Sequence, residues 1–472
     1  MSQIKTVSTS SVVPNGISRR DFFGVGARLA AGAITALPFM LSGEVSAAPL
    51  QALTNFSNNR NGDPWVLVRK PGTEVRPLVI IFLGGGPNQK IFDPKPDAPA
   101  EFRALFGAID TKTEGLKLSE LLPKTARDVD QFRVIRCMEA TRLDHAQGAA
   151  QSMTGNHRLV GSSPTDQQAE PVHDAGHIKL AEFYSRRTLG CVMLATRTYN
   201  TFGGLQPRHR YVTSYVECDL TNGHTYPPQL RAGGNPERAR TVLDLRNAFE
   251  RDTNPEIYGR QGRDVDEIYE ATRFILGRNF ANAFDSNVPD KVRAQVGYGP
   301  YPNAAIVAAK LIQEGAPLVF LSLDGWDTHG DELATLKENV TYRIDGREVT
   351  GRGLGFQLDD AINYLKDTIG DRAAIFAFGE FGRSPNHTQE RGYSARGTNH
   401  GGVYSMLATG AGVSPGVTGE TDRTGSRVIS RERYSQGSAL ERALNAAGYM
   451  RVKVIGSGVL TSDPERFSTQ DW

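Results

Sequence analysis

The stretch PLVFLSLDGWDTHG, residues 317–330, begins as a continuous apolar run and ends in acidic and histidine side chains. An apolar run of this kind is typical of a strand buried on both faces, as in a parallel sheet. The polar tail then lies at the carboxyl end of the strand, which is where open α/β sheets bind their ligands. The stretch therefore indicates both a fold class and the place of a site.

The same pattern recurs along the chain. Further apolar runs occupy residues 77–83, 132–138, 373–378 and 404–407. Helical spacing lies between or after them, at about residues 145–153, 303–314, 356–369 and 437–447. Strands that alternate with helices predict an α/β fold with a doubly wound, mostly parallel sheet. Residues 220–302 are charged and helical in pattern, so we expect them to form an insertion beside this sheet.

The N-terminus carries the pattern of a twin-arginine (Tat) export signal. Arg19 and Arg20 precede the aromatic Phe22 and Phe23, and a small-residue apolar run follows at residues 29–42. This run of about 14 residues is shorter than the roughly 20 that cross a bilayer, which favours a removable signal over a stable membrane anchor. The alternative is an incidental arginine pair before a buried helix.

Small residues at the end of the leader place the expected cleavage after Ala47. The sequence thus predicts a Tat signal peptide over residues 1–47 and a single α/β domain over residues 48–472. The Tat translocase is then the partner during export, and the mature protein is periplasmic or secreted.

The charge balance and the cysteine count limit the kinds of partner and of cross-link that we expect. The 54 basic residues nearly balance the 52 acidic ones, which argues against nucleic acid as a partner. Three cysteines, Cys137, Cys191 and Cys218, are too few for a disulfide framework. Each lies in or beside a strand-like run, so burial as a small hydrophobe is favoured, although one pair could oxidise outside the cytoplasm.

Ligand-type side chains follow or precede several predicted strands. Carboxylate and imidazole together favour zinc, manganese or iron over calcium and magnesium. A bound divalent ion could polarise an ester oxygen or lower the pKa of a water molecule. The alternative is that these residues only cap helices and turns. The candidate metal ligands are Asp324, Asp327, His329, Glu380 and His400.

Two further residues are candidates for a catalytic role. His145, after the second strand, could face the substrate, bind a metal or accept a phosphoryl group. Arg383 could clamp an anionic substrate oxygen or simply pair with Glu380. Trp326 could be a core residue or a lid, with the core favoured. His173 and His177, four residues apart, are a minor metal candidate.

Five segments make the chain resemble domain-of-unknown-function family 1501, which is placed in the alkaline phosphatase and sulfatase superfamily. The resemblance runs from about residue 77 to 450 and implies that superfamily's fold and cleavage of phosphate or sulfate esters by metal-bound Asp and His. Tat leaders are common in the family. The segments are GGGP (84–87), FDPKPDAP (92–99), LSELLP (118–123), GWDTH (325–329) and GEFGR (379–383).

The resemblance also exposes departures from the superfamily pattern. The first metal-binding Asp is expected near Gly84, where this chain has glycines and Asp93 comes later. The sulfatase signature, counted back from Thr154, puts His145 at the position of the nucleophile. Glu380 and Phe381 replace the later Asp-His pair, whereas the histidine of residue 400 matches the final His.

Two functions fit these residues. The first is a metal-dependent hydrolase of phosphate or sulfate esters, acting on an anionic ester or polysaccharide. The second is a non-catalytic periplasmic protein that uses the same fold for binding or assembly, as the missing nucleophile suggests.

Overall fold

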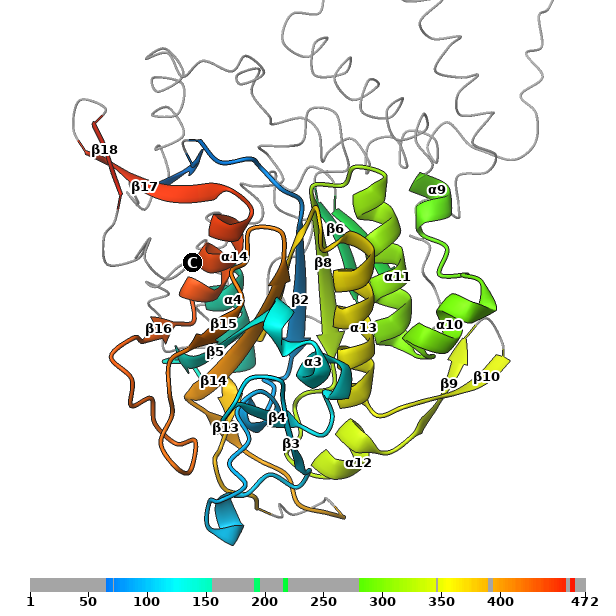
Figure 1. Cartoon of the computed structure of the whole chain (residues 1–472), viewed down its shortest axis with the longest axis vertical. Helices are drawn as coiled ribbons and strands as arrows, with labels where there is room; N and C mark the ends of the chain where they lie inside the picture. The colour runs from blue at the N-terminus through cyan, green and yellow to red at the C-terminus, as the bar shows by residue number, and fades with distance from the viewer. Residues whose placement is uncertain are drawn as a thin grey trace, which may run out of the picture.

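The computed structural model describes residues 65–70, 72–154, 191–195, 215–219, 280–344, 347–388, 394–455 and 459–462. The predicted signal peptide, His173, His177 and most of the expected insertion at 220–302 lie outside these residues. Within them, a nine-stranded mixed sheet has helices on both faces (Figure 1). No helix among the described residues combines the length and apolarity that crossing a membrane requires.

The centre of the sheet is parallel. Strands β11, β2, β8, β6 and β7 run side by side in that order and in one direction. Strand β14 reverses the direction against β11 and β5, while β15 and β16 run parallel to β5. The predicted doubly wound, mostly parallel α/β sheet is confirmed. The strand bounds are β2 Leu78–Gly84, β5 Phe132–Glu139, β6 Cys191–Ala195, β7 Tyr215–Asp219, β8 Leu318–Asp324, β11 Ala374–Gly379, β14 Val403–Gly410, β15 Gly416–Thr418 and β16 Tyr434–Ser435.

The residues of β2 alternate between two apolar cores, since successive strand side chains point to opposite faces. Val79, Ile81 and Leu83 belong to the core with helices α11 (Pro300–Gln313) and α13 (Leu354–Ile369). Leu78, Ile80 and Phe82 belong to the core with α14 (Ser438–Ala446) and Ala149 of α4 (His145–Thr154). Burial on both faces explains why this strand is a continuous apolar run.

Smaller elements surround the sheet. A β-hairpin projects beside α10, and a second sheet joins β1 to the C-terminal strands (Figure 1). Their bounds are β1 Trp65–Arg69, η2 Gln89–Ile91, η3 Ala100–Phe102, β3 Ala108–Asp110, β4 Lys117–Ser119, α3 Pro123–Arg127, η4 Val129–Gln131, α9 Phe280–Ala283, α10 Asp290–Val296, α12 Glu332–Lys337, β9 Val340–Ile344, β10 Arg347–Gly351, β12 Gly382–Arg383, β13 His400–Gly401, β17 Tyr449–Ile455 and β18 Val459–Ser462.

Two residues whose role the sequence left open are core residues. Trp326 is 1 % exposed and its ring lies 6.3 Å from that of Tyr301, so it is no lid. Cys137 is a buried free cysteine on β5, as a small hydrophobe would be.

The turn after β2 passes unusually close to the turn after β8. Gly85 has a φ of +109°, and a Cβ at this position would lie 2.1 Å from the backbone nitrogen of Asp327. Only glycine fits this conformation and this approach without strain. The two turns therefore pack backbone against backbone, which brings Asp327 over the end of β2.

Candidate metal site at the strand ends

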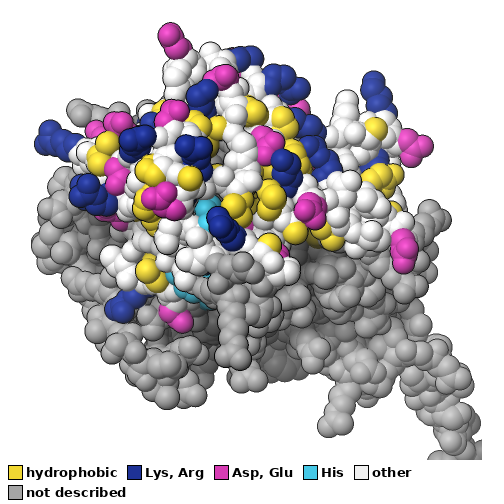
Figure 2. Space-filling view, turned by 90° about the horizontal axis from the view of Figure 1, so that it is seen from below, with side chains coloured by type: hydrophobic (Ala, Val, Ile, Leu, Met, Phe, Trp, Pro, Cys, Tyr) yellow, Lys and Arg dark blue, Asp and Glu magenta, His cyan; other side chains and the backbone are white. Residues whose placement is uncertain are grey.

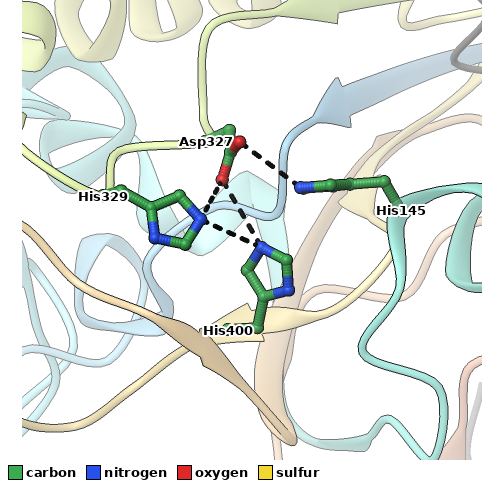
Figure 3. A group of neighbouring side chains, drawn as sticks. All are labelled: His145, Asp327, His329 and His400. Atoms are coloured by element: carbon green, nitrogen blue, oxygen red, sulfur yellow. Dashed lines mark hydrogen bonds and ion pairs between the residues drawn. The ribbon is translucent and has the colours of Figure 1, made fainter.

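Four side chains converge at the carboxyl ends of the strands. His145, Asp327, His329 and His400 each offer one ligand atom, and these atoms lie within 4.8 Å of one another (Figure 3). We call these residues the His–Asp group. They come from the start of α4, the turn after β8 and the strand β13. Topology thus gathers residues that are far apart in the sequence.

Three of the four ligand atoms form a compact triangle. Asp327 Oδ1 lies 3.0 Å from His329 Nε2 and 3.6 Å from His400 Nε2, and the two nitrogens are 3.2 Å apart. In a tetrahedral zinc site with bonds of about 2.0–2.1 Å, ligand atoms are about 3.3 Å apart. The triangle therefore has the size of one face of such a site.

The other ring nitrogens of these two histidines are held by oxygen acceptors. His329 Nδ1 lies 2.9 Å from Asn399 Oδ1, and His400 Nδ1 lies 2.5 Å from the carbonyl oxygen of Leu143. An oxygen acceptor places the proton on Nδ1 and leaves the lone pair on Nε2. Both imidazoles are thereby prepared to ligate a metal through Nε2.

His145 differs from the other two histidines because both of its nitrogens face carboxylates. Its Nδ1 lies 2.8 Å from Glu380 Oε1, and its Nε2 lies 3.3 Å from Asp327 Oδ2. Burial lowers the pKa of His145, but the hydrogen bonds to Asp327 and Glu380 outweigh burial and raise the pKa to about 9. This environment favours an imidazolium that holds a proton over a metal ligand.

Asp327 is the common partner of the group. Burial raises its pKa, but the hydrogen bond from His145 and the charge of Arg383 hold that pKa well below its usual range. Its carboxylate is therefore ionised, with Oδ1 directed to the triangle and Oδ2 to His145.

Two of the expected metal ligands lie outside the group. Asp324 is still part of β8, in register with Gly84, and the chain turns over the sheet edge only from Gly325 onward. Glu380 is fully buried and accepts from the backbone N–H of Gly85 at 2.8 Å as well as facing His145. Glu380 thus contacts the His–Asp group only through His145 and is not one of its ligand-type residues.

Arg383 lies beneath the group and not on its rim. Its side chain is fully buried, and Nη1 donates to Asp327 Oδ1 at 2.8 Å and to the carbonyl of Gly85 at 3.1 Å. Nε donates to Thr398 Oγ1 at 3.3 Å. The partner of Arg383 is thus Asp327 and not the expected Glu380, and its guanidinium is covered by protein atoms.

The first metal-binding Asp that the sequence resemblance implies near Gly84 has no counterpart in the group. Asp93 is buried with Arg136 and Lys95, at 3.1 and 2.9 Å, and with Thr421. Its carboxylate therefore belongs to a separate ion-pair network.

Sequence reasoning also missed the partners that orient the group. The carbonyl of Leu143 has no side-chain signature, since any residue supplies one. His387, in the loop after β12, is buried, and its Nε2 lies 3.0 Å from Glu332 Oε2. The polar context of residue 387 gave no signal that its side chain turns inward.

A family model described as "Protein of unknown function (DUF1501)" matches residues 75–438, a span that includes the whole His–Asp group. The chain belongs to this DUF1501 family. The match confirms the resemblance drawn from the five sequence segments, whereas Tat export stays a prediction.

Other comparisons give only distant similarity. No curated protein matches the chain. Among solved structures, Ps i-CgsB in complex with k-i-k-neocarrahexaose has a TM-score of 0.37 at 11% identity, covering 79% of this chain and 72% of that one. Ps i-CgsB alone has a TM-score of 0.36 at 14% identity, with the same coverage of 79% and 72%. Alkaline phosphatase from the Antarctic bacterium TAB5 has a TM-score of 0.31 at 10% identity, covering 79% of this chain and 99% of that one. At such TM-scores, no residue of this DUF1501 protein takes a role from these structures.

Proposed function

We propose that Asp327, His329 and His400 hold a divalent metal ion in an exported hydrolase of phosphate or sulfate esters. The observation that carries the proposal is the triangle of ligand atoms whose two imidazoles are each tied at Nδ1 by an oxygen acceptor. Imidazole and carboxylate ligands fit zinc, manganese or iron better than calcium or magnesium.

The open side of the group suits a substrate. The side chains of Asp327 and His145 are 44% and 40% exposed. Figure 2, which looks onto this face, shows histidine atoms at the surface with Lys and Arg side chains nearby. Helix α4 begins at His145, and the first N–H groups of a helix have no partner within it. Such a helix start favours an anionic group beside the site, which supports a phosphate or sulfate ester as the substrate.

A divalent ion held here would act as a Lewis acid toward an ester oxygen or a water molecule. The chain's own contribution is to hold and move a proton. Glu380 fixes the ring of His145 through Nδ1, and Asp327 keeps Nε2 at the group. From this position, the Nε2 proton can pass to the oxygen of a departing alcohol.

The proposal includes export of the enzyme from the cytoplasm. The twin arginine and the leader of residues 1–47 support passage through the Tat translocase and a periplasmic or secreted enzyme. Folding before export would allow the ion to be bound in the cytoplasm.

Metal content is the direct test. Protein purified without chelators should contain about one equivalent of zinc, manganese or iron, and His400→Ala should remove it. Asp371→Ala is the matched control, because Asp371 is an exposed carboxylate that precedes β11 at the opposite end of that strand. Fewer than about 0.2 equivalents of any divalent metal in the wild-type protein would reject the proposal.

One observation favours a second function, a non-catalytic binding or assembly protein. The sulfatase signature, counted back from Thr154, has His145 at the position of the nucleophile and not a serine, threonine or cysteine. Hydrolysis of p-nitrophenyl phosphate or sulfate that is abolished by both a chelator and His400→Ala would exclude this alternative. A metal-loaded protein with no turnover on either ester would favour it.

A further inference from the structure

A second buried pair lies outside the His–Asp group. Glu332 Oε2 and His387 Nε2 are 3.0 Å apart, and their side chains are 0% and 3% exposed. Glu332 is the first residue of α12 and follows His329 by three positions. His387 belongs to the segment that leads from β12 to His400 on β13. The pair thus joins the two segments that carry the proposed histidine ligands.

Glu332 also reaches a third segment. Its Oε1 accepts from Asn88 Nδ2 at 2.8 Å, in the loop after β2. Asn88 is 1% exposed, and its own Oδ1 accepts from the backbone of Lys90 at 3.0 Å, which fixes the amide. One buried carboxylate therefore ties together the three segments around the site.

The backbone between His329 and Glu332 needs such a tie. Asp331 has a φ of 53°, a left-handed conformation that non-glycine residues adopt only where neighbours hold them. The N–H of Thr398 donates to the carbonyl of Thr328 at 2.9 Å, so the two ligand segments also meet directly at this point. Glu332 fixes the C-terminal end of the short segment between His329 and α12, which contains Asp331.

We infer that Glu332 and His387 are positioning residues of the proposed metal site. They set the separation of His329 and His400 by fixing the segments on which these histidines lie. The inference rests on the proposed function, because it needs an ion bound by the triangle of ligand atoms. A triangle with edges of 3.0 to 3.6 Å loses affinity when one ligand segment shifts.

The test measures zinc affinity on the full chain by chelator competition. Glu332→Gln and His387→Leu should each weaken zinc binding by about 10- to 100-fold, as expected for partners that orient ligands. His387→Gln should keep most of the affinity, because its amide nitrogen can take the place of Nε2 and still donate to Glu332. The visible spectrum of the cobalt(II) form should change in the first two variants and not in the third.

Asp359→Asn is the matched control for lost stability. Asp359 is an equally buried carboxylate, but its partners Thr125 and Asn363 lie on α3 and α13. The Asp359→Asn substitution should lower the melting temperature without changing the zinc affinity or the cobalt(II) spectrum. Equal zinc affinity in wild type, Glu332→Gln and His387→Leu would overturn this inference alone. Absence of zinc, manganese and iron binding by the wild type would overturn the proposed function, and the inference with it.

Discussion

Two buried carboxylates, Asp359 and Glu380, show how differently this protein uses the same chemical group. Asp359 accepts from the backbone N–H groups of Lys124 and Thr125, at 2.8 and 2.9 Å, and from the hydroxyl of Thr125 at 2.7 Å. Glu380 accepts from Gly85 N and faces His145 with the same oxygen, and its Oε2 has no hydrogen-bond partner among the described residues.

The contrast separates a carboxylate that builds the fold from one that serves a site. Asp359 satisfies the free N–H groups at the start of α3, which is the ordinary structural use of a buried acid. Glu380 is equally buried, but its hydrogen-bonded oxygen is shared between the backbone of the turn after β2 and the ring of His145. This contact indicates that Glu380 fixes the ring of His145 and stabilises its positive charge.

The largest expected effect follows from removing the charge of Glu380. Glu380→Gln keeps an acceptor for Gly85 but no longer favours the imidazolium of His145. Turnover of the ester that wild type hydrolyses best should fall by about 10- to 100-fold. Zinc content should stay at the wild-type level, because Glu380 lies outside the triangle of ligands. Loss of zinc in this variant would indicate that Glu380 is itself a metal ligand, and would contradict the distinction drawn between Glu380 and the ligands of the triangle.

A smaller effect, of a different kind, is expected for Asp359→Asn. Burial raises the pKa of Asp359 more than its hydrogen bonds lower it, so a neutral amide is partly tolerated. The free energy of unfolding should fall by about 1–2 kcal/mol, measured by urea denaturation, through loss of hydrogen bonds to α3. Turnover and zinc content should match wild type. Loss of turnover in the folded variant would show that the two carboxylates are not separate in function.

The smallest effect is a dependence of stability on pH in the metal-free protein. His145 has a pKa of about 9 when folded, against an ordinary 6.5, so the folded state binds its proton more tightly. Its contribution is complete below about pH 6.5 and is lost as the pH rises through 9. Because His145 is 40% exposed, solvent screening limits this contribution to about 1 kcal/mol. Urea denaturation of chelator-treated protein at several pH values should show the decline in wild type and a flatter profile in His145→Gln. Parallel profiles would contradict the pairing of His145 with the two carboxylates.

Much of the architecture can be predicted from sequence because its causes are local. Strands β2 and β8 are continuous apolar runs, and the polar residues that follow them must lie at the sheet edge. Asp327 and His329 could therefore be placed at that edge before any coordinates. His400 precedes β14 and reaches the same edge only because β14 runs antiparallel to β11, a direction that an apolar run does not reveal.

The remaining details depend on contacts between distant segments. Asp324 and Asp327 look equivalent in the sequence, yet the turn at Gly325 brings only Asp327 to the group. Glu332 and His387 are 55 positions apart, and no periodicity connects them. The role of each carboxylate, whether as a metal ligand, as a partner of a ligand or as a helix cap, depends on which groups its side chain can contact in the folded chain.

The packing of Gly85 against Asp327 also constrains how this sequence can change. A Cβ at residue 85 would lie 2.1 Å from the backbone nitrogen of Asp327. No single substitution can introduce a side chain there while the turn at 325–327 keeps its path. The two positions are therefore epistatic: the turn must be remodelled before a side chain at residue 85 can be accepted, and homologues should vary at both places together or at neither.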